Sequence, residues 1–330
     1  MVQTLDLTGV FNVECKVNFL EKYDNFNTKK AFIRIFRNTY SIEEDLNKDL
    51  CLFTRVELEE FFENTSPSTN VSARNYGRLV GHYLQWAVEE NIISEHPFPV
   101  QQNYFLKYVK RDYDIFIDLK ELNYYTNMYF ENLQDAIILE LLFLGVQGKE
   151  GSEICNLTIS DLDEENHSMK LYDSTTERRR TIYFEDNRLI KLCKRANKED
   201  RYEKRNGEIE YNPRIRPYTE LVMDTDYILK NSKTNTVHDG QVTKYTIYNR
   251  LKNIQKFAQI EPYKQKITVK NIVKSGQLYM ASKLYEKEGE LGLPQIRKIC
   301  GHFGVKESWP LRDHLNEENL FKLYPHLKGK

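Results

Sequence analysis

The stretch Ile267–Gly304, ITVKNIVKSGQLYMASKLYEKEGELGLPQIRKICGHFG, decides how the fold and the function of this chain are interpreted. It has the pattern of an opening turn, a helix and a closing Gly-His element. The charge in and around this stretch is strongly positive, because nine basic side chains and only three acidic ones lie in the range Lys264 to Lys306. Two of these cations are Lys270 and Lys274. Whether the chain is an enzyme or a binding protein depends on what these positions can do.

The net charge of the chain is −1, but its charges are unevenly distributed along the sequence. Ser41–Asn64 holds eight acidic and two basic side chains, whereas Arg178–Arg205 holds eleven basic and five acidic ones. Such asymmetry is expected of a protein that binds a polyanion with selected faces. Solvated helix faces explain the same runs about equally well. Composition alone therefore leaves both interpretations open.

The composition is that of a globular protein rather than a membrane or disordered one. The 330 residues suffice for two domains, and 40% hydrophobic with 29% charged residues is typical of soluble proteins. The longest apolar run, Ala136–Leu144, is interrupted by Glu140 and predicts a buried helix, not a membrane span. The first residues lack the pattern of a secretion signal, so we expect a cytoplasmic location.

The five cysteines are scattered and form no Cys-x-x-Cys pair. This pattern predicts reduced thiols in a cytosolic protein, with no disulfide framework, no metal site and no cofactor. Cys300 and His302 could together suggest a thiol nucleophile or a pair of metal ligands, but no third ligand stands at a suitable spacing. The cysteines are Cys15, Cys51, Cys155, Cys193 and Cys300.

The first hundred residues predict a helical domain. In Thr28–Tyr40 the apolar residues face inward, which leaves Lys29, Lys30 and Arg34 available outward. Pro97 ends the region, and we place the interdomain linker at about Glu95 to Arg111.

Two further helices of this domain have recognisable start signals. Thr54, followed three residues later by Glu57, has the spacing of a capping box. Ser72 can cap a long helix, SARNYGRLVGHYLQWAVEENII. The apolar stripe of that helix comprises Tyr76, Val80, Tyr83 and Ala87. Its opposite face carries Arg74, Arg78 and His82.

The second part of the chain predicts helices around a small hairpin. SMKLYD and RRRTIYF alternate in the manner of strands, with a turn at Ser174 to Thr176. The charged region Asp200 to Arg216 predicts an exposed loop or an insertion. Thr243–Ala258 predicts an amphipathic helix with Lys244 and Arg250 on its outer face. The other helices are expected at Asp118–Met128, Glu131–Leu144, Ser152–Leu157 and Arg188–Lys198.

The order of these elements resembles the tyrosine recombinases, or phage integrases, over nearly the whole chain. DAIILELLFLGVQGKEGSEICNLTISDLD resembles the opening helices of the family's second domain, ITVKNIVKSGQ resembles its I-T-x-H-x-L-R-H-T box, and ICGHFG resembles its Leu-Gly-His element. The resemblance implies a mainly α fold with a small β-sheet. A helical core-binding (SAM-like) domain is then expected at residues 1–105, and an α+β catalytic-type domain at residues 112–330.

An active member of that family uses a tyrosine to attack a DNA phosphate and form a covalent 3′-phosphotyrosyl link. Two arginines stabilise the developing negative charge, and a lysine with His or Trp groups completes the site. Such electrostatic stabilisation supplies most of the acceleration, and an unassisted tyrosine with a pKa near 10 is a poor nucleophile.

Carried over residue by residue, this machinery is mostly missing. The first arginine falls on Gln147 or, in an alignment through Glu153, on Glu150. The hairpin lysine has no clear match, although Lys170 is nearby. The family's His, Arg and His of the box fall on Lys270, Val273 and Lys274, whereas His302 matches the Leu-Gly-His histidine. The nucleophile is expected at Leu311, and Tyr324 is the only tyrosine beyond it. The resemblance thus implies the fold without strand cleavage.

What remains of the family's capacity is sequence-specific binding of double-stranded DNA. The sequence resembles the integrase-like repressors of SPβ-type temperate Bacillus phages, which implies a prophage repressor that maintains lysogeny. Its partners would be operator sites and an antirepressor or regulatory protein, and the oligomeric state stays open. The alternatives are a divergent recombinase, with Tyr324 as a displaced nucleophile, and an accessory module of an active integrase. The candidate DNA contacts are Lys29, Lys30, Arg34, Arg74, Arg78, His82, Arg178, Arg179, Arg180, Lys244, Arg250, Lys270 and Lys274.

Overall fold

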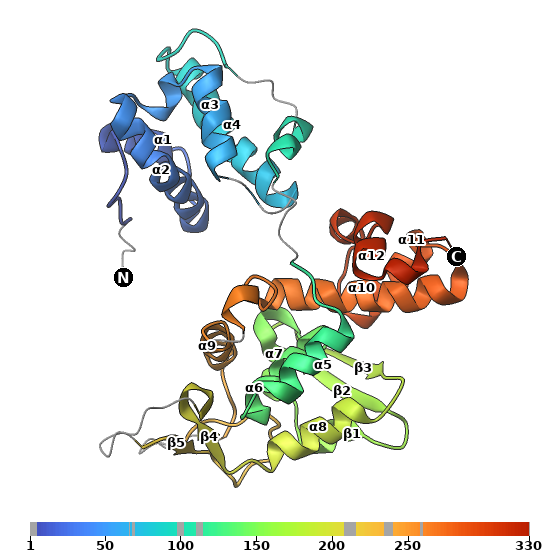
Figure 1. Cartoon of the computed structure of the whole chain (residues 1–330). Coiled ribbons are helices and arrows are strands. Elements are labelled where there is room, and N and C mark those ends of the chain that lie inside the picture. Colours follow the sequence, from blue (N-terminus) through green and yellow to red (C-terminus); the bar gives the residue numbers. More distant parts are fainter. Residues whose placement is uncertain are drawn as a thin grey trace. The chain divides into compact units, whose positions relative to one another are not determined.

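The computed structural model divides the chain into two units, Met1–Tyr113 and Asp114–Lys330 (Figure 1). Both units are mainly helical, and the small sheets lie in the second, which confirms the predicted fold class. No helix among the described residues is both long and apolar enough to cross a membrane. Part of the expected linker, residues 98–101 and 110–111, lies outside the described residues. The structure describes residues 5–65, 67, 70–97, 102–109, 115–207, 216–233, 240–257 and 260–329.

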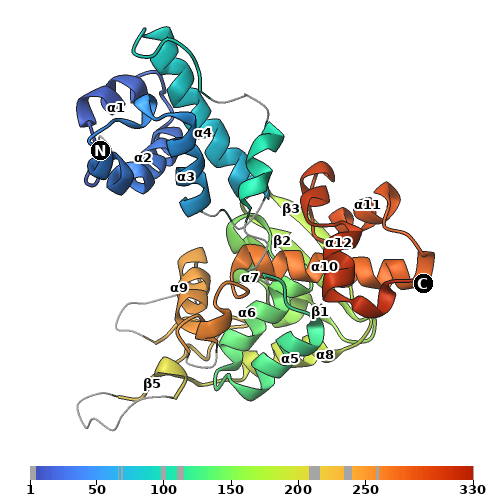
Figure 2. The same ribbon diagram turned by 45° about the horizontal axis from the view of Figure 1, so that its top comes forward.

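The described part of the N-terminal unit is helical (Figure 2), and its helices pack around an aromatic core. The rings of Phe19 and Phe32 meet edge to face at 4.7 Å between centroids, and Tyr83 packs on Phe19 at 5.0 Å. The predicted capping box is confirmed, because Thr54 N donates to the Glu57 carboxylate at 2.6 Å and Glu57 N to the Thr54 hydroxyl at 3.4 Å. The helices are α1 (Val13–Leu20), α2 (Phe26–Leu46), α3 (Arg55–Thr65) and α4 (Asn70–Glu89), with 3-10 turns η1 (Leu50–Leu52) and η2 (Gln102–Tyr108).

Helix α4 turns its predicted apolar stripe into this core. Val80, Tyr83 and Ala87 are buried, and Tyr76 is half-buried. The helix begins at Asn70, however, so Ser72 lies inside its first turn and not at the expected N-cap position.

The C-terminal unit is organised on two central helices, α6 (Leu133–Phe143) and α10 (Val269–Glu288). Every residue of α6 from Gln134 to Phe143 is buried, as its nearly continuous apolar sequence predicted. Thr268 caps α10 by accepting a hydrogen bond from Asn271 N at 3.1 Å. The remaining helices are α5 (Leu119–Met128), α7 (Ser152–Asn156), α8 (Arg188–Asn197), α9 (Lys244–Ile254), α11 (Leu293–His302) and α12 (Glu317–Leu323).

Short 3-10 turns connect these helices, and α11 and α12 both pack against α10 (Figure 1). The 3-10 turns are η3 (Lys149–Gly151), η4 (Ile159–Asp161), η5 (Lys204–Gly207), η6 (Glu261–Tyr263), η7 (Trp309–Asp313) and η8 (Pro325–Leu327).

The larger described sheet of this unit is three-stranded and antiparallel, in the order β1-β2-β3. It contains β1 (Leu162–Asp163), β2 (Ser168–Asp173) and β3 (Arg178–Tyr183), with Met169 opposite Ile182. The predicted hairpin is therefore confirmed. The prediction for Asp200 to Arg216 is wrong in part, because this region begins with a strand: β4 (Arg201–Glu203) pairs with β5 (Tyr218–Glu220). Residues 208–215 lie outside the described residues.

Candidate nucleic-acid interface

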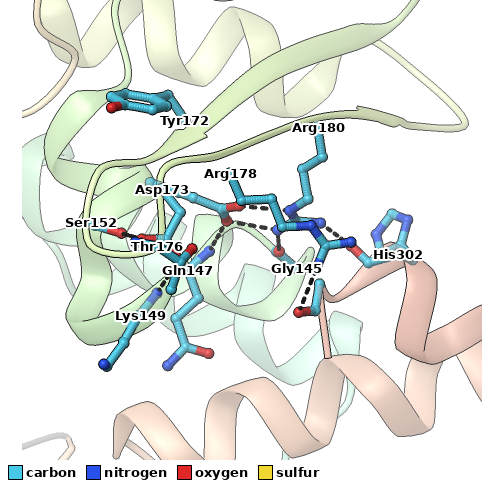
Figure 3. Close-up of polar contacts among 12 residues, drawn as sticks. Gly145, Gln147, Lys149, Ser152, Tyr172, Asp173, Thr176, Arg178, Arg180 and His302 are labelled. Carbon is cyan, nitrogen blue, oxygen red and sulfur yellow. Dashed lines mark hydrogen bonds and ion pairs between the residues drawn. The ribbon is translucent and has the colours of Figure 1, made fainter. Parts of the chain in front are cut away.

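The centre of the C-terminal site is a buried arginine on β3. The Arg180 guanidinium donates to both carboxylate oxygens of Glu153 at 2.6 Å, to Gly145 O at 2.6 Å and to His302 O (Figure 3). Its side chain is 9% exposed and that of Glu153 is 4% exposed. Arg180 thus joins the hairpin to the end of α6, to α7 and to the end of α11. Because four of its five N–H donors are used inside the protein, Arg180 is a poor candidate for the DNA contact that the sequence suggested.

A second buried acid fixes the loop where the family's first arginine is expected. Asp173 accepts from the Ser152 hydroxyl at 2.6 Å, from Lys149 N at 2.8 Å and from Thr175 N at 3.0 Å. Burial alone would raise the pKa of Asp173, but these hydrogen bonds hold it at about 2. Asp173 therefore stays ionised at neutral pH and ties the hairpin turn to the loop before α7.

Both positions considered for the first arginine lie on that loop. The backbone of Gln147 exchanges hydrogen bonds with Glu153, through Gln147 N at 3.0 Å and Glu153 N at 3.2 Å. Glu150 pairs with Lys244 at 2.6 Å. The exposed cation of the loop is Lys149, which the sequence did not place among the DNA contacts. Its position could not be read from the sequence, because the Asp173 bond that holds it comes from the hairpin.

The segment ITVKNIVKSGQ, which resembles the family's box, contains three residues at the positions of the catalytic groups. One is an exposed cation, one packs against the core, and one is a half-buried cation. Lys270 is exposed on the first turn of α10. Val273 is half-buried and packs against two hydrophobic clusters of the unit, so its aliphatic side chain has a structural role. The pKa of Lys274 is lowered to about 8, mainly by burial and to a smaller extent by the nearby charge of Lys270.

The surviving histidine is held by the backbone. His302 Nε2 lies 3.0 Å from Leu144 O, so this nitrogen carries the proton, and burial lowers the pKa of the ring. The ring also approaches Gly145 so closely that a Cβ there would lie 2.9 Å from His302 Cδ2. His302 therefore acts as a neutral donor that joins α11 to the end of α6.

The two candidate positions for a nucleophile are both inside the protein. Leu311, nine residues after His302, is 6% exposed in the core formed by α10, α11 and α12. Tyr324 is 9% exposed, and its hydroxyl makes no hydrogen bond to any described residue. Burial raises the pKa of Tyr324, which makes its phenolate harder to form.

The hairpin has two exposed arginines, Arg178 and Arg179, beside the buried Arg180, and Figure 3 shows Arg178 next to Arg180. The Arg179 guanidinium stacks 4.3 Å from the centre of the Tyr172 ring, and Arg178 Nη1 donates to Gly304 O at 3.4 Å. Each contact leaves donors of the guanidinium free to bind another group. Arg178 and Arg179, together with Lys149 and Lys270, are the exposed cations that we call the C-terminal basic set.

Other cations of this unit are held by partners far away in the sequence. Arg250, expected on the outer face of α9, is 7% exposed and donates to Lys230 O at 2.8 Å and to Gln134 Oε1 at 3.1 Å. That prediction is wrong, because the long side chain folds inward to satisfy buried carbonyl groups. The local charge surplus is likewise reduced by the pairs Lys244–Glu150, Arg188–Glu140, Lys194–Glu164, Lys266–Glu121 and Lys283–Glu185.

In the N-terminal unit, cations of α2 line a surface cavity of about 640 Å³. Lys30 and Arg34 are exposed there, and the Lys30 ammonium lies 4.5 Å from the centre of the Phe26 ring. Arg37, on the same side, is occupied by the Asp6 carboxylate at 2.7 Å. Lys29 is half-buried. Lys30 and Arg34 are therefore the α2 cations best placed to meet an anion.

Helix α4 presents its predicted polar stripe, although its histidine adds no charge. Arg78 and His82 are exposed, and Arg74 is half-buried. The pKa of His82 is lowered, mainly by partial burial and to a smaller extent by the charge of Arg78. His82 is therefore neutral at physiological pH and can only offer a hydrogen bond.

The pKa of Lys274 predicts a pH-dependent interaction with DNA. With a pKa of about 8, the ammonium is mostly charged at pH 7 and mostly neutral at pH 9. A phosphate beside it would favour the charged form, so raising the pH over this range is expected to weaken binding by up to about tenfold. Its neighbour His314 does not titrate in this range, because burial and the two lysines lower its pKa to about 3.

The matched variant for this prediction is Lys274→Arg, whose charge persists at pH 9. Affinity for a duplex is measured at pH 7, 8 and 9 by fluorescence anisotropy at one ionic strength. The wild-type affinity should fall with pH, whereas the affinity of the variant should stay constant. Equal pH dependence in the two proteins would remove Lys274 from the interface.

Two protein-family models, one for each of two domains, match the chain. The one described as "MrpR, N-terminal core-binding domain" matches residues 10–89, and the one described as "MrpR, C-terminal catalytic domain" matches residues 116–325. The SPbeta prophage-derived uncharacterized protein YopR of Bacillus subtilis (strain 168) is 25% identical over 332 residues, which cover 97% of this chain and 98% of YopR.

Solved structures of integrases are similar at lower identity. The Tn1549 transposon integrase in complex with transposon right end DNA is 14% identical, with 95% of this chain and 98% of that chain covered and a TM-score of 0.48. A lambda integrase dimer bound to a COC′ core site is 10% identical, with 93% and 76% covered and a TM-score of 0.47. Because the matched domains together span more than half of the residues, the chain belongs to the MrpR family.

Proposed function

We propose that this chain binds double-stranded DNA in a sequence-specific manner, does not cut it, and acts as the transcriptional repressor of a prophage. One observation carries the proposal: exposed cations persist around the box and the hairpin, while the residues that would react with a phosphate are absent. The C-terminal basic set supplies charge-assisted contacts to the backbone of a duplex, and Lys30, Arg34 and Arg78 supply them in the N-terminal unit.

Cleavage is disfavoured by the groups that stand at the reacting positions. The place of the second arginine is taken by Val273, which packs in a core. Neither Gln147 nor Glu150 can give the bidentate positive charge that a first arginine provides. Leu311 has no nucleophilic atom, and the buried Tyr324 hydroxyl would have to leave its core to reach a phosphate.

The repressor role follows from binding without turnover. A protein that occupies a DNA site and cannot complete strand exchange remains there until its affinity is lowered, which can exclude polymerase from a promoter. YopR, the relative in Bacillus subtilis, is described as prophage-derived, which fits a regulator carried by a phage genome. Release would then need an antirepressor or another regulatory protein.

The test of the proposal is duplex binding by the hairpin. Arg178→Glu combined with Arg179→Glu is expected to weaken binding at 0.15 M salt by roughly tenfold or more, and to reduce the salt dependence by about one unit of log–log slope for each lost phosphate contact. Binding is measured by gel shift and anisotropy, with operator fragments first selected from a sheared library of the host genome.

The matched control is Arg201→Glu, which changes an exposed arginine of the same unit on β4. It should leave both affinity and salt slope within about twofold of the wild type. The proposal fails if the wild-type protein selects no fragment and shows no salt-sensitive binding. An accessory role would be indicated instead if fragments were bound only when an integrase was added.

A further inference from the structure

The N-terminal unit holds two cysteines in one polar pocket within its aromatic core. Cys15 lies on α1 and is half-buried, whereas Cys51 lies in η1 and is 2% exposed. Their sulfur atoms and a carboxylate oxygen of Asp49 all lie within 4.8 Å of one another. Cys15 Sγ also lies 3.4 Å from the Tyr83 hydroxyl of α4. The scattered cysteines of the sequence thus include one close pair.

The carboxylate in this pocket is already satisfied. Asp49 Oδ1 accepts from Cys51 N and from the Tyr83 hydroxyl, both at 2.9 Å, and Oδ2 accepts from Asn12 Nδ2 at 3.0 Å. The ammonium of buried Lys16 stands 3.9 Å from Oδ2. A metal ion would have to break these hydrogen bonds and approach a positive charge, so the pocket favours chemistry between the two sulfurs over metal binding.

The two thiols are unequal, which is the arrangement of an attacking and a resolving cysteine. Hydrogen bonding with Cys51 is the main reason why the pKa of Cys15 is lowered to about 7. The same contact, with burial, raises the pKa of Cys51. The partly accessible sulfur therefore ionises first, with the protonated sulfur beside it. By contrast, burial raises the pKa of Cys155 to about 11.

We propose that Cys15 and Cys51 form a reversible thiol–disulfide pair that is oxidised by a peroxide. The Cys15 thiolate attacks one oxygen of hydrogen peroxide, the O–O bond breaks, and hydroxide leaves and is protonated to water. The Cys51 sulfur then attacks the Cys15 sulfur, the S–O bond breaks, and water leaves with the proton of Cys51. The two thiols lose two electrons and two protons in total, and one peroxide becomes two waters.

Only a small movement is needed, because the sulfurs must close from less than 4.8 Å to the 2.05 Å of a disulfide. The bond would link α1 to η1 across the pocket. This chemistry does not depend on whether the chain binds DNA.

The test uses the full chain, reduced and then exposed to hydrogen peroxide at pH 7. A mass loss of two hydrogens and a linked Cys15–Cys51 peptide are expected, both reversed by a thiol reductant. In Cys51→Ser, the oxidation should stop at a sulfenic acid on Cys15 that dimedone traps. Cys15→Ser should form no disulfide, and Cys155→Ser should behave as the wild type. Before oxidation, iodoacetamide should alkylate Cys15 at least about tenfold faster than Cys155.

Three results would overturn the proposal. One is the oxidation of Cys15 to a sulfinic acid in the wild type with no linked peptide. The second is equal alkylation rates for Cys15 and Cys155. The third is stoichiometric zinc in the purified chain that is lost in Cys15→Ser, which would make the pocket a metal site. A circular dichroism spectrum for each variant shows that the fold is kept.

Discussion

Replacing Arg180 by alanine is expected to lower the free energy of unfolding of the C-terminal unit by about 3–5 kcal/mol, because the change leaves the buried Glu153 carboxylate without its partner. The guanidinium also satisfies Gly145 O and His302 O, and these carbonyl groups would lose their donor as well. For a unit of this size the loss corresponds to a fall in Tm of about 6–20 °C.

The control for this prediction is Arg179→Ala, one residue away on the same strand. Its side chain is exposed and stacks on Tyr172, so the loss should stay below about 1 kcal/mol. Arg180→Lys keeps the charge but cannot form the forked contact, and an intermediate Tm is expected. Differential scanning calorimetry of the full chain measures all three. Equal Tm values for Arg180→Ala and Arg179→Ala would contradict the role given to Arg180.

Gly276→Ala is expected to destabilise the same unit by about 3 kcal/mol or more. At this point α10 crosses α6 so closely that a Cβ on Gly276 would lie 1.7 Å from Phe143 O. The clash is with backbone, which no rotamer change can relieve, so α10 has to move away from the helix that forms the centre of the core. Because α10 carries the box, this movement should also weaken DNA binding.

Gly301→Ala is the matched control, because Gly301 also lies in a helix and a Cβ there would have no neighbour within 4 Å. Its free energy of unfolding should stay within about 1 kcal/mol of the wild-type value, and could rise through the better helix propensity of alanine. Urea unfolding of both variants measures the difference. If Gly276→Ala unfolds at the wild-type urea concentration, the close crossing of α6 and α10 is contradicted.

The sequence predicted most of the elements because their signals are local. The capping box at Thr54, the stripe through Tyr83 and the alternation of the hairpin are all set by residues a few positions apart. The pair β4–β5 was missed, since its strands are short and separated by charged residues.

The roles of individual arginines were harder to predict. Three adjacent positions, 178 to 180, hold the same residue type. Strand alternation nevertheless places Arg180 on the same side as the buried Ile182. That signal separates Arg180 from Arg179 but not from Arg178, which alternation places on the same side and which lies at the end of β3 next to the turn. No comparable signal existed for Arg250, because its partners at residues 134 and 230 are brought together only by the fold.

The central claim, binding without cutting, is tested most directly with a nicked duplex that traps covalent recombinase intermediates. A selected operator fragment of this design is incubated with the protein, and equal samples are run in native and in SDS gels. We expect a shifted band in the native gel and only free DNA in the SDS gel. An SDS-resistant protein–DNA adduct, abolished by Tyr324→Phe, would contradict the claim and establish a divergent recombinase.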